Sequence, residues 1–521
     1  MTSLSPEALQ AIGLVFFAGL IIFIVVAWRA RPESWKISTF FLAGRNIGAP
    51  TTKHVYWGTS FSLVNGLFYF SVLGYHYGLA AIWFQIPWIA GIGILAWHLP
   101  QVMKETNRFT IHGFLGDLYG EKIRTLASWV TLTGFLGFFA FEINVSLEIL
   151  GGLVGFSELV IPLTILFAVY SAAYCDIGGF AGTAKTDKFQ NYSGVIAVLL
   201  VGSFILVSPH PQLPIDNLGV PRLAESLIDF SSIPWVTIFG VGCFALFYNF
   251  VDMSNWQTIA ASSEVGEKEI RKLRWSMGFS ALLMLAFPAT IGTFLGYVWQ
   301  GVEVGDYERL FLLIEQVFPN ASYIGGLLLG LVVLGLAAIA MSTSDSYLMV
   351  SAQTVSWDIE DKKLLEQYER SDNIPEEEQY EVVRKSRTRL YIMAVISVVL
   401  FLVLRHFLGD EMVIPFQFVL AGLVVSLAPA TLFGLYCRKK DYSPTGWVKK
   451  LPGFSIIAGY LGGTGVFLWF LFLSMPKEFD IYAWAPIASL SLSSIVCLLA
   501  LLGMPKRKIE QSVEGEQPNE R

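Results

Sequence analysis

The sequence predicts an all-α polytopic membrane protein. Of its 521 residues, 54% are hydrophobic and only 15% are charged, and the mean hydropathy is +0.58. Soluble domains do not have this composition, whereas bundles of membrane-spanning helices do. Thirteen apolar stretches are long enough to cross a bilayer as helices.

The thirteen predicted spans follow one another along most of the chain. The fourth and ninth are long and are expected to extend beyond the membrane. The first has no cleavage pattern and is too long for a signal peptide, so it is expected to be retained. The spans cover residues 9–29, 52–75, 78–100, 123–153, 158–176, 189–208, 235–257, 272–299, 321–356, 386–406, 413–437, 452–473 and 483–503.

The positive residues predict the orientation of these spans. Lys and Arg gather in the loop after the first span and in every second loop from there, while the loops between hold little beyond Arg222 and Arg309. Cytoplasmic loops carry this excess. The N-terminus is therefore expected on the extracellular or periplasmic side and the C-terminus in the cytoplasm. The expected location is a bacterial-type inner or plasma membrane.

Two loops and the tail are polar. The loop 209–234 is expected outside, and the acidic loop 358–387 is expected in the cytoplasm, where its glutamates indicate a solvated helix or a disordered face. The tail after Met504 is predicted to be disordered. The four cysteines show no spacing typical of a metal site or a disulfide framework.

The ninth span has a polar centre in an apolar setting. Ser342, Thr343 and Ser346 share one helical stripe with Ile339, and Asp345 lies among them. Two hydroxyls and the carbonyl of Ile339 form a nest of oxygens, which is the ligand type that hard cations take. The alternative is that the hydroxyls only bond back to the preceding turn or help helices to pack. An ionisable group at membrane depth favours the ion site.

Two other spans are interrupted at mid-depth by polar and small residues. Broken helices in corresponding halves of a transporter point to its binding site, because unwound backbone offers carbonyls and amides to ligands. For Asn65 the alternative is a hydrogen bond between helices. The interrupting residues are Ser62, Asn65 and Gly66 in the second span and Tyr248, Asn249 and Asp252 in the seventh.

Five pieces of the sequence, in the right order, resemble the sodium/solute symporter family. This group includes sodium-coupled sugar, proline, pantothenate and sialic acid carriers. The resemblance covers nearly the whole chain. The five pieces are FLAGR at 41–45, GTSFSLVN at 58–65, Gly178-Gly179 with Thr186-Asp187 and Gln190, Asp252 with Gln257, and Ser342-Thr343 with Asp358-Ile359.

The resemblance implies an inverted-repeat core of the leucine-transporter type. The first repeat would be 52–208 and the second 235–437, joined by the loop 209–234. Residues 1–51 and 438–503 would add one and two helices, and 504–521 a cytoplasmic tail. The implied function is sodium-coupled symport of a small organic solute, a sugar, amino acid, carboxylate or amine, by alternating access.

The resemblance also implies two cation sites. The main sodium site maps to the carbonyls of Leu63, Gly66 and Ile339 and the hydroxyls of Ser342 and Thr343. This set includes the nest already inferred from the spacing on the ninth span.

A second site, found in some members, maps to Asp187, Ser342, Asp345 and Ser346. Two carboxylates there could bind one sodium ion tightly or could share a proton. Asp187 has another reading, because Thr186-Asp187 followed by Gln190 is also typical of a helix N-cap.

The solute is expected between the two helix breaks and beside the fourth span. Glu142 could answer a cationic solute, helped by aromatic rings through cation–π contact, or could be a protonated carboxyl bonded to a neighbouring helix. Three departures weaken a sugar assignment: Thr258 follows Gln257, Asn249 replaces an aromatic residue, and the His and Glu of sugar carriers are absent. The expected solute-binding residues are Asn65, Tyr69, Glu142, Asn144, Tyr248, Asn249 and Asp252.

A rival interpretation is a membrane sensor or an uncoupled, channel-like protein with the same fold. Receptor-type relatives usually append a signalling domain, and this sequence shows none. An enzyme is not expected, since no nucleophile–base pair occurs at membrane depth. The expected partners are the solute, sodium ions and the lipid bilayer, with no nucleic acid, and the expected state is a monomer.

Overall fold

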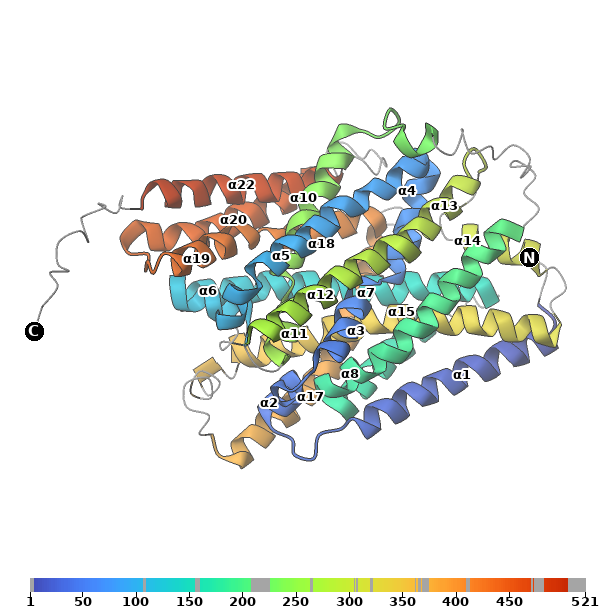
Figure 1. Cartoon of the computed structure of the whole chain (residues 1–521), viewed down its shortest axis with the longest axis horizontal. Coiled ribbons are helices and arrows are strands. Elements are labelled where there is room, and N and C mark those ends of the chain that lie inside the picture. Colours follow the sequence, from blue (N-terminus) through green and yellow to red (C-terminus); the bar gives the residue numbers. More distant parts are fainter. Residues whose placement is uncertain are drawn as a thin grey trace, which may run out of the picture.

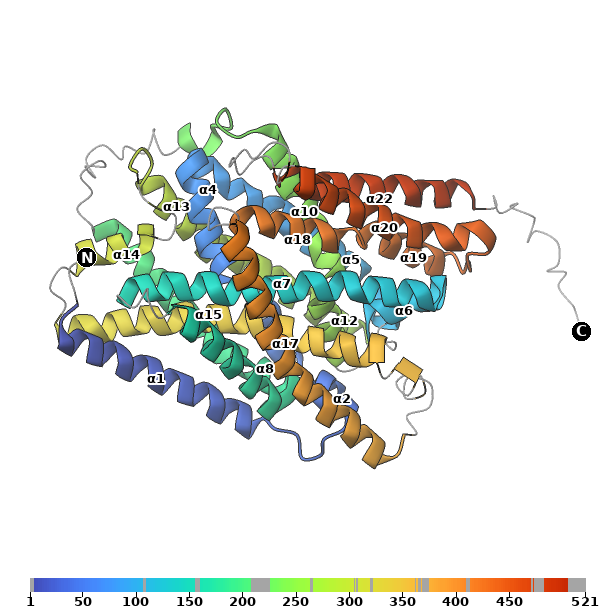
Figure 2. The same ribbon diagram turned by 180° about the vertical axis from the view of Figure 1, so that it is seen from behind.

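The structure, a computed structural model, describes residues 4–105, 109–154, 160–207, 225–262, 266–303, 305, 308–318, 322–360, 362–363, 367, 374–408, 413–469, 472 and 482–504. This part of the chain forms a bundle of long helices (Figures 1 and 2). The one β-bridge within it joins Ile47 to Ser262.

Eleven helical stretches of the described chain are long and apolar enough to cross a membrane. Two of them, Leu63–Glu105 and Val160–Val207, each overlap two of the thirteen predicted spans. The first bends at Gly78 (φ 71°) and the second at Gly179 (φ 55°), a backbone conformation that glycine adopts without strain. The multi-pass, all-α architecture is confirmed, and the number thirteen stays a prediction.

The α-helices follow one another along the described chain and are connected by short segments. Their bounds are α1 Pro6–Arg29, α2 Ile37–Leu42, α3 Ala49–Ser60, α4 Tyr69–Tyr77, α5 Gln85–Glu105, α6 Ile111–Tyr119, α7 Glu121–Val154, α8 Val160–Val207, α10 Trp235–Val251, α11 Met253–Ala261, α12 Glu267–Met284, α13 Thr290–Val298, α14 Glu308–Val317, α15 Tyr323–Thr354, α17 Glu376–Leu408, α18 Val413–Val425, α19 Ala428–Lys439, α20 Gly446–Trp469 and α22 Trp484–Leu502.

The predicted interruption of the second span is confirmed. Helix α3 ends at Ser60, Ser62 is extended (φ −78°, ψ 142°), and a short π-helical segment, η2, covers Leu63–Phe68 before α4. The Ser62 hydroxyl accepts a 2.8 Å hydrogen bond from the Asn65 amide. The backbone hydrogen bonding of the helix is therefore interrupted between Ser60 and Leu63, in the middle of the span.

The seventh span is broken in the same way. Helix α10 ends at Val251, Asp252 is extended (φ −61°, ψ 110°), and α11 follows. The carbonyls that α10 leaves unpaired are taken up by α11: Asn255 Nδ2 donates to Asn249 O (2.8 Å) and Trp256 Nε1 to Phe250 O (3.0 Å). This break is therefore held in a fixed shape.

The second half of helix α15 is enclosed by the bundle. All of its residues from Leu336 to Thr354 are buried, and it packs against α1, α7 and α8. At Gly335 a Cβ would lie 2.3 Å from the Ser193 carbonyl oxygen of α8. Close approach of two backbones at small residues is a common way for membrane helices to associate.

The chain after α15 differs from the predicted cytoplasmic loop 358–387. Asp358 is fully buried in the segment η8, Val355–Glu360, and is not part of a solvated loop. Its carboxylate accepts from Arg124 Nε (2.8 Å) and Thr110 Oγ1 (3.0 Å) and pairs with His112 Nδ1 (2.9 Å). These contacts fix the end of α15 to α6 and α7.

The glutamate run of that loop begins α17, where acidic residues are favourable for the helix dipole. Glu376 forms an exposed ion pair with Lys36 (2.8 Å). Residues 209–224 of the predicted outer loop and the tail from 505 onward lie outside the described residues.

Candidate functional site

Three helices distant in sequence bring buried oxygens together. The Ser342 hydroxyl on α15 donates to Asp187 Oδ1 on α8 (2.5 Å). The Thr343 hydroxyl donates to the carbonyls of Gly58 on α3 (3.1 Å) and Ile339 (3.3 Å). We call Gly58, Asp187, Ile339, Ser342 and Thr343 the oxygen cluster; its three polar side chains are at most 1% exposed.

Gly58 makes this approach sterically feasible. A Cβ on residue 58 would lie 2.1 Å from Ser342 Oγ and 3.0 Å from Asp187 Oδ1. Its carbonyl is also available, because it belongs to the last turn of α3, where carbonyls lack partners within the helix. The end of α3 therefore supplies both the room and one acceptor.

The hydrogen bonds join three of the five predicted sodium ligands and add a new one. The hydroxyls of Ser342 and Thr343 bond to Asp187, Gly58 and Ile339, and make no hydrogen bond to Leu63 or Gly66. The Gly66 carbonyl accepts from the Tyr69 amide. The carbonyls of Leu63 and Gly66 stay predicted ligands, and the Gly58 carbonyl was not predicted.

The second predicted cation position lies next along α15. Tyr174 OH on α8 donates to Asp345 Oδ2 (2.6 Å) and to Met341 O (3.1 Å). The Ser346 hydroxyl lies 3.4 Å from Asp345 Oδ1, 3.2 Å from the Ser342 carbonyl and 3.2 Å from the Thr59 hydroxyl. Tyr174 was not foreseen in this group.

The two ionisable groups of this region are both acidic. Asp187 and Asp345 are both buried, and neither forms an ion pair with a Lys, Arg or His of the described chain. A buried carboxylate without a cationic partner is strongly unfavourable. The geometry therefore fits a cation: five oxygens, one of them from a carboxylate, converge in the oxygen cluster.

Asp187 does not act as a helix cap. It lies inside α8, well past the bend at Gly179, and its side chain bonds to Ser342 on another helix. The alternative reading of Thr186-Asp187 as an N-cap is thus wrong, because the helix begins earlier than the local pattern indicates.

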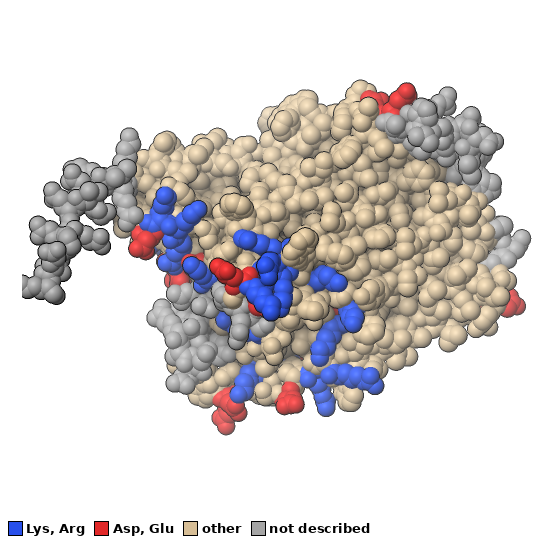
Figure 3. Space-filling view, viewed as in Figure 1, with Lys and Arg blue, Asp and Glu red and all other residues tan. Residues whose placement is uncertain are grey.

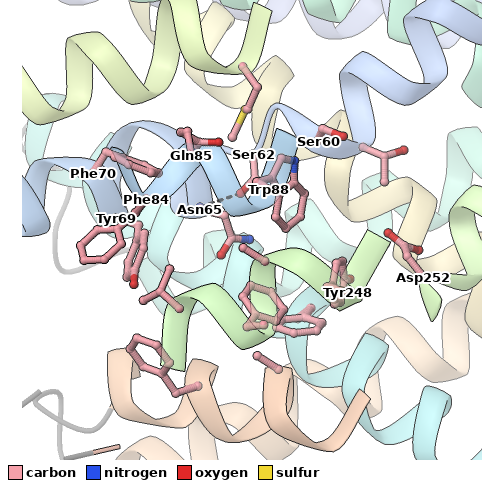
Figure 4. A pocket seen from close by; sticks show the side chains of 18 of the residues that line it. Ser60, Ser62, Asn65, Tyr69, Phe70, Phe84, Gln85, Trp88, Tyr248 and Asp252 are labelled. Atoms are coloured by element: carbon pink, nitrogen blue, oxygen red, sulfur yellow. Dashed lines mark hydrogen bonds between the residues drawn. The ribbon is translucent and has the colours of Figure 1, made fainter. Parts of the chain in front are cut away.

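A cavity of about 70 Å³ lies beside both helix breaks. By the measure in which one water needs about 10–15 Å³, it has room for several waters or a small polar group. Asn65 and Gln85 point toward it from one side and Tyr248 from the other (Figure 4). Its lining residues are Thr59, Ser60, Ser62, Asn65, Tyr69, Phe70, Phe84, Gln85, Trp88, Phe138, Val241, Phe244, Ala245, Tyr248, Asp252, Met284, Tyr347, Phe418 and Ala421.

Aromatic rings form most of its wall. Trp88 stacks on Tyr248 with ring centroids 5.8 Å apart. Phe138 meets Tyr248 edge-on at 5.8 Å and Tyr347 at 5.7 Å. No Lys or Arg of the described chain lines the cavity, and its one acidic residue is Asp252.

Four of the seven predicted solute-binding residues line this cavity: Asn65, Tyr69, Tyr248 and Asp252. The other three do not. Asn249 lines a separate small hollow with Asn255, Asn144 Nδ2 donates to Glu148 Oε1 (3.4 Å), and Glu142 bonds to the broken second span. A role of these three residues in solute binding stays a prediction.

Glu142 covers the start of η2. Its Oε2 accepts from the Ser62 hydroxyl (2.5 Å), and its Oε1 from the amides of Leu63 (2.9 Å) and Val64 (3.4 Å). These amides are the unpaired donors at a helix N-terminus, where a negative charge is favourable. All three groups donate to Glu142, so it serves as an acceptor at the break.

Asp252 occupies the equivalent place at the second break. Its Oδ1 accepts from the amide (2.7 Å) and the hydroxyl (2.5 Å) of Ser254. Two segments start at the breaks, η2 in the second span and α11 in the seventh. The N-terminal amides of both are therefore capped by a carboxylate of the protein itself.

Gln85 is the most informative residue that the sequence-based reading missed. Its side chain is 4% exposed, and its Oε1 has no hydrogen-bond partner among the described residues. The signal was a lone amide in the apolar third span, GLAAIWFQIPW. A buried carbonyl oxygen left without a donor is ready to accept one from a bound solute.

Known structures were compared with this one. No protein-family model and no curated protein sequence matches the chain. A sodium-coupled sialic acid symporter, solved substrate-bound and outward-open, matches with a TM-score of 0.68 at 14% identity, over 94% of this chain and 98% of that one. MhsT in complex with L-phenylalanine matches with a TM-score of 0.52 at 13% identity, over 87% of this chain and 97% of that one.

Together these matches establish the fold. Over 94% of its length the chain has the helical architecture of the sodium-coupled symporter, and the predicted leucine-transporter type of fold is confirmed. The protein is a multi-pass membrane protein of this architecture.

Proposed function

We propose that the protein is a sodium-coupled symporter, and no enzyme, that moves a small organic solute across a cell membrane by alternating access. Its N-terminus faces the outside and its C-terminus the cytoplasm, as the distribution of Lys and Arg indicates. The observation that carries the proposal is the oxygen cluster, a buried acidic site beside the broken second span with no cationic side chain of its own.

Sodium is the ion we assign to the oxygen cluster. The donors are two hydroxyls, two carbonyls and one carboxylate, and hard cations prefer oxygen ligands. An ion bound there would join α3, α8 and α15. Because α3 leads directly into the break that borders the cavity, sodium binding and solute binding would share one moving element.

A second cation, sodium or a proton, is assigned to Asp345 and Ser346 with Asp187 and Ser342. Asp345 accepts from Tyr174 and Ser346 links it to the Ser342 carbonyl and to Thr59. Two carboxylates in one buried region need positive charge nearby, and neutral hydroxyl groups do not supply it.

The cavity between the two breaks is the proposed solute site. In this type of fold a free half-helix N-terminus attracts an anionic group of the substrate. Here Glu142 already accepts from the amides of η2, and Asp252 from the amide of α11. The solute would therefore not be held through a carboxylate at either helix end.

The unpaired groups of the cavity favour a solute that supplies hydrogen-bond donors as well as acceptors. Gln85 Oε1 needs a donor, Trp88 Nε1 needs an acceptor, and the Tyr248 hydroxyl has no partner among the described residues. The aromatic wall suits either an ammonium group or the apolar face of a sugar ring, whereas a simple carboxylate supplies no donor. We therefore expect amines and neutral hydroxylated solutes to be carried in preference to carboxylates.

The driving force is adequate. One sodium ion entering down a potential of ~100 mV contributes about 2.3 kcal/mol, and a tenfold concentration ratio adds about 1.4 kcal/mol. A neutral solute could then be accumulated roughly several hundredfold per coupled ion.

The test is uptake into proteoliposomes. Labelled amines, polyols, sugars, amino acids and carboxylates would be offered with an inward sodium gradient or an equal potassium gradient. Accumulation above equilibrium only with sodium, for an amine or a hydroxylated solute, is the expected result. Equal entry under both gradients without accumulation would favour an uncoupled, channel-like protein, and a carboxylate substrate would overturn the solute assignment.

A further inference from the structure

A second and larger cavity, of about 350 Å³, lies on the surface between the end of α1, the start of α3 and the part of α8 that follows its bend at Gly179. It does not share a residue with the solute cavity or the oxygen cluster. It is lined by Val26, Arg29 and Ala30 of α1, by Pro50, Thr51 and His54 of α3, and by Ala184, Lys185, Lys188 and Phe189 of α8. We call it the basic hollow.

The basic hollow carries positive charge without compensation. Arg29, Lys185 and Lys188 are exposed, and none of them forms an ion pair with a described residue. No Asp or Glu lines the hollow. The face in Figure 3 shows Lys and Arg gathered in its lower and left parts. Three like charges around one hollow attract an anion.

His54 provides an independent sign that a ligand binds. The residue is 5% exposed and lines the hollow. Its Nδ1 is buried and has no hydrogen-bond partner among the described residues. Buried polar atoms are normally paired, and a polar ligand in the hollow is one way to pair this one.

The surface beside the hollow is apolar and continuous with the membrane-facing side of the bundle. Val25 and Ile22 on α1 are exposed, and Phe189, Tyr192 and Ile196 on α8 are each between 46% and 49% exposed. Trp28 is 52% exposed at the end of α1, and Trp is enriched where membrane meets water. A ligand here would meet cations at one end and hydrocarbon at the other.

We propose that the basic hollow binds an anionic phospholipid of the surrounding leaflet. Its phosphate would lie among Arg29, Lys185 and Lys188, and its acyl chains along the exposed stripes of α1 and α8. Basic pockets between membrane helices are suited to such headgroups. The lipid would bridge α1, α3 and α8. Since α3 carries Gly58 one turn after His54, it would also hold the half-helix that closes the oxygen cluster.

The experiment uses the purified full chain in a neutral detergent. Native mass spectrometry would count bound phosphatidylglycerol against phosphatidylcholine, and melting would be followed with each lipid. The double variant Lys185→Gln/Lys188→Gln would be compared with Lys449→Gln/Lys450→Gln, an equally charged exposed pair on α20. Lys185→Arg/Lys188→Arg keeps the charge.

Phosphatidylglycerol is expected to bind and to raise the melting temperature of the wild type, with little effect of phosphatidylcholine. The double Gln variant at 185 and 188 should bind it roughly thirtyfold more weakly, while the 449/450 pair and the Arg variant should bind as the wild type does. Equal weakening in both Gln pairs, or equal binding of both lipids, would overturn the site. Full competition by millimolar inorganic phosphate would assign it to a free anion instead and overturn the lipid.

Discussion

Ser342 and Asp187 are 155 positions apart in the chain and are joined by a 2.5 Å hydrogen bond between α15 and α8. Both are buried, and the backbone of Gly58 on α3 packs against them so closely that no side chain fits between. The contact joins α15 to α8, and the hydrogen bond from Thr343 to the Gly58 carbonyl adds α3, the half-helix that leads to the solute cavity. The first two predictions concern it.

Asp187→Asn should weaken sodium binding without harming the fold. The amide oxygen can still accept from Ser342, but the negative charge is lost. We expect the half-saturating sodium concentration to rise at least about tenfold, equivalent to about 1.4 kcal/mol, at normal expression and melting temperature. The control is Asp229→Asn, an exposed aspartate at which no change is expected. Unaltered sodium dependence in Asp187→Asn would contradict a cation site here.

Gly58→Ala should disrupt the oxygen cluster. The added Cβ would lie 2.1 Å from Ser342 Oγ and 3.0 Å from Asp187 Oδ1, so these two side chains must move from their positions in the cluster. Loss of sodium-dependent uptake is expected. In the control Gly278→Ala, on an exposed face of α12, a Cβ meets nothing within 4 Å, and helix propensity favours Ala by roughly 1 kcal/mol. Equal uptake by both variants would argue against the close contact.

Glu142→Gln should affect stability and leave solute selectivity unchanged. The wild-type carboxylate accepts from three donors at the start of η2, and an amide cannot accept as well at both positions. A loss of about 1–3 kcal/mol is expected for a donor left unpaired. The measurement is the melting temperature, together with uptake ratios for a competing amine and polyol. A changed ratio at unchanged stability would return Glu142 to the solute site.

Gln85→Leu and Asn65→Leu should lower solute affinity. Both side chains line the cavity, and their removal leaves polar groups of the solute unpaired, at a cost of about 1–3 kcal/mol or roughly ten- to hundredfold in affinity. Asn249→Leu is the matched comparison, because that amide lies outside the cavity. It should change expression or stability more than affinity. Equal losses of affinity in all three variants would show that Asn249 also belongs to the solute site.

The architecture was accessible from the sequence because its determinants are local. Long apolar stretches define the spans, and Ser62 and Asp252 interrupt two of them where the helices do break. The pairing of Asp187 with Ser342 came from family resemblance; nothing in the local pattern of either segment specifies it.

The sequence does not predict which residues of different helices face one another. The carbonyl that faces Thr343 is that of Gly58, and not that of Leu63 or Gly66, because α3 ends at Ser60 and frees the carbonyls of its last turn. The contacts of Glu142 depend on packing in the same way. A buried carboxyl near a binding site can face the solute or a helix end, and the packing of α7 on η2 places it at the helix end. Gln85 and Tyr174 carried no pattern beyond being polar in apolar spans.

The most direct test of the account is equilibrium binding of ²²Na⁺ to the purified protein, in the wild type and in Ser342→Ala and Thr343→Ala. Each substitution removes one oxygen of the oxygen cluster and leaves the apolar packing of α15 nearly intact. The account predicts saturable binding to the wild type that potassium does not displace, and half-saturation at least about tenfold higher in each variant. Identical binding curves for the three proteins, or no saturable binding to the wild type, would contradict it.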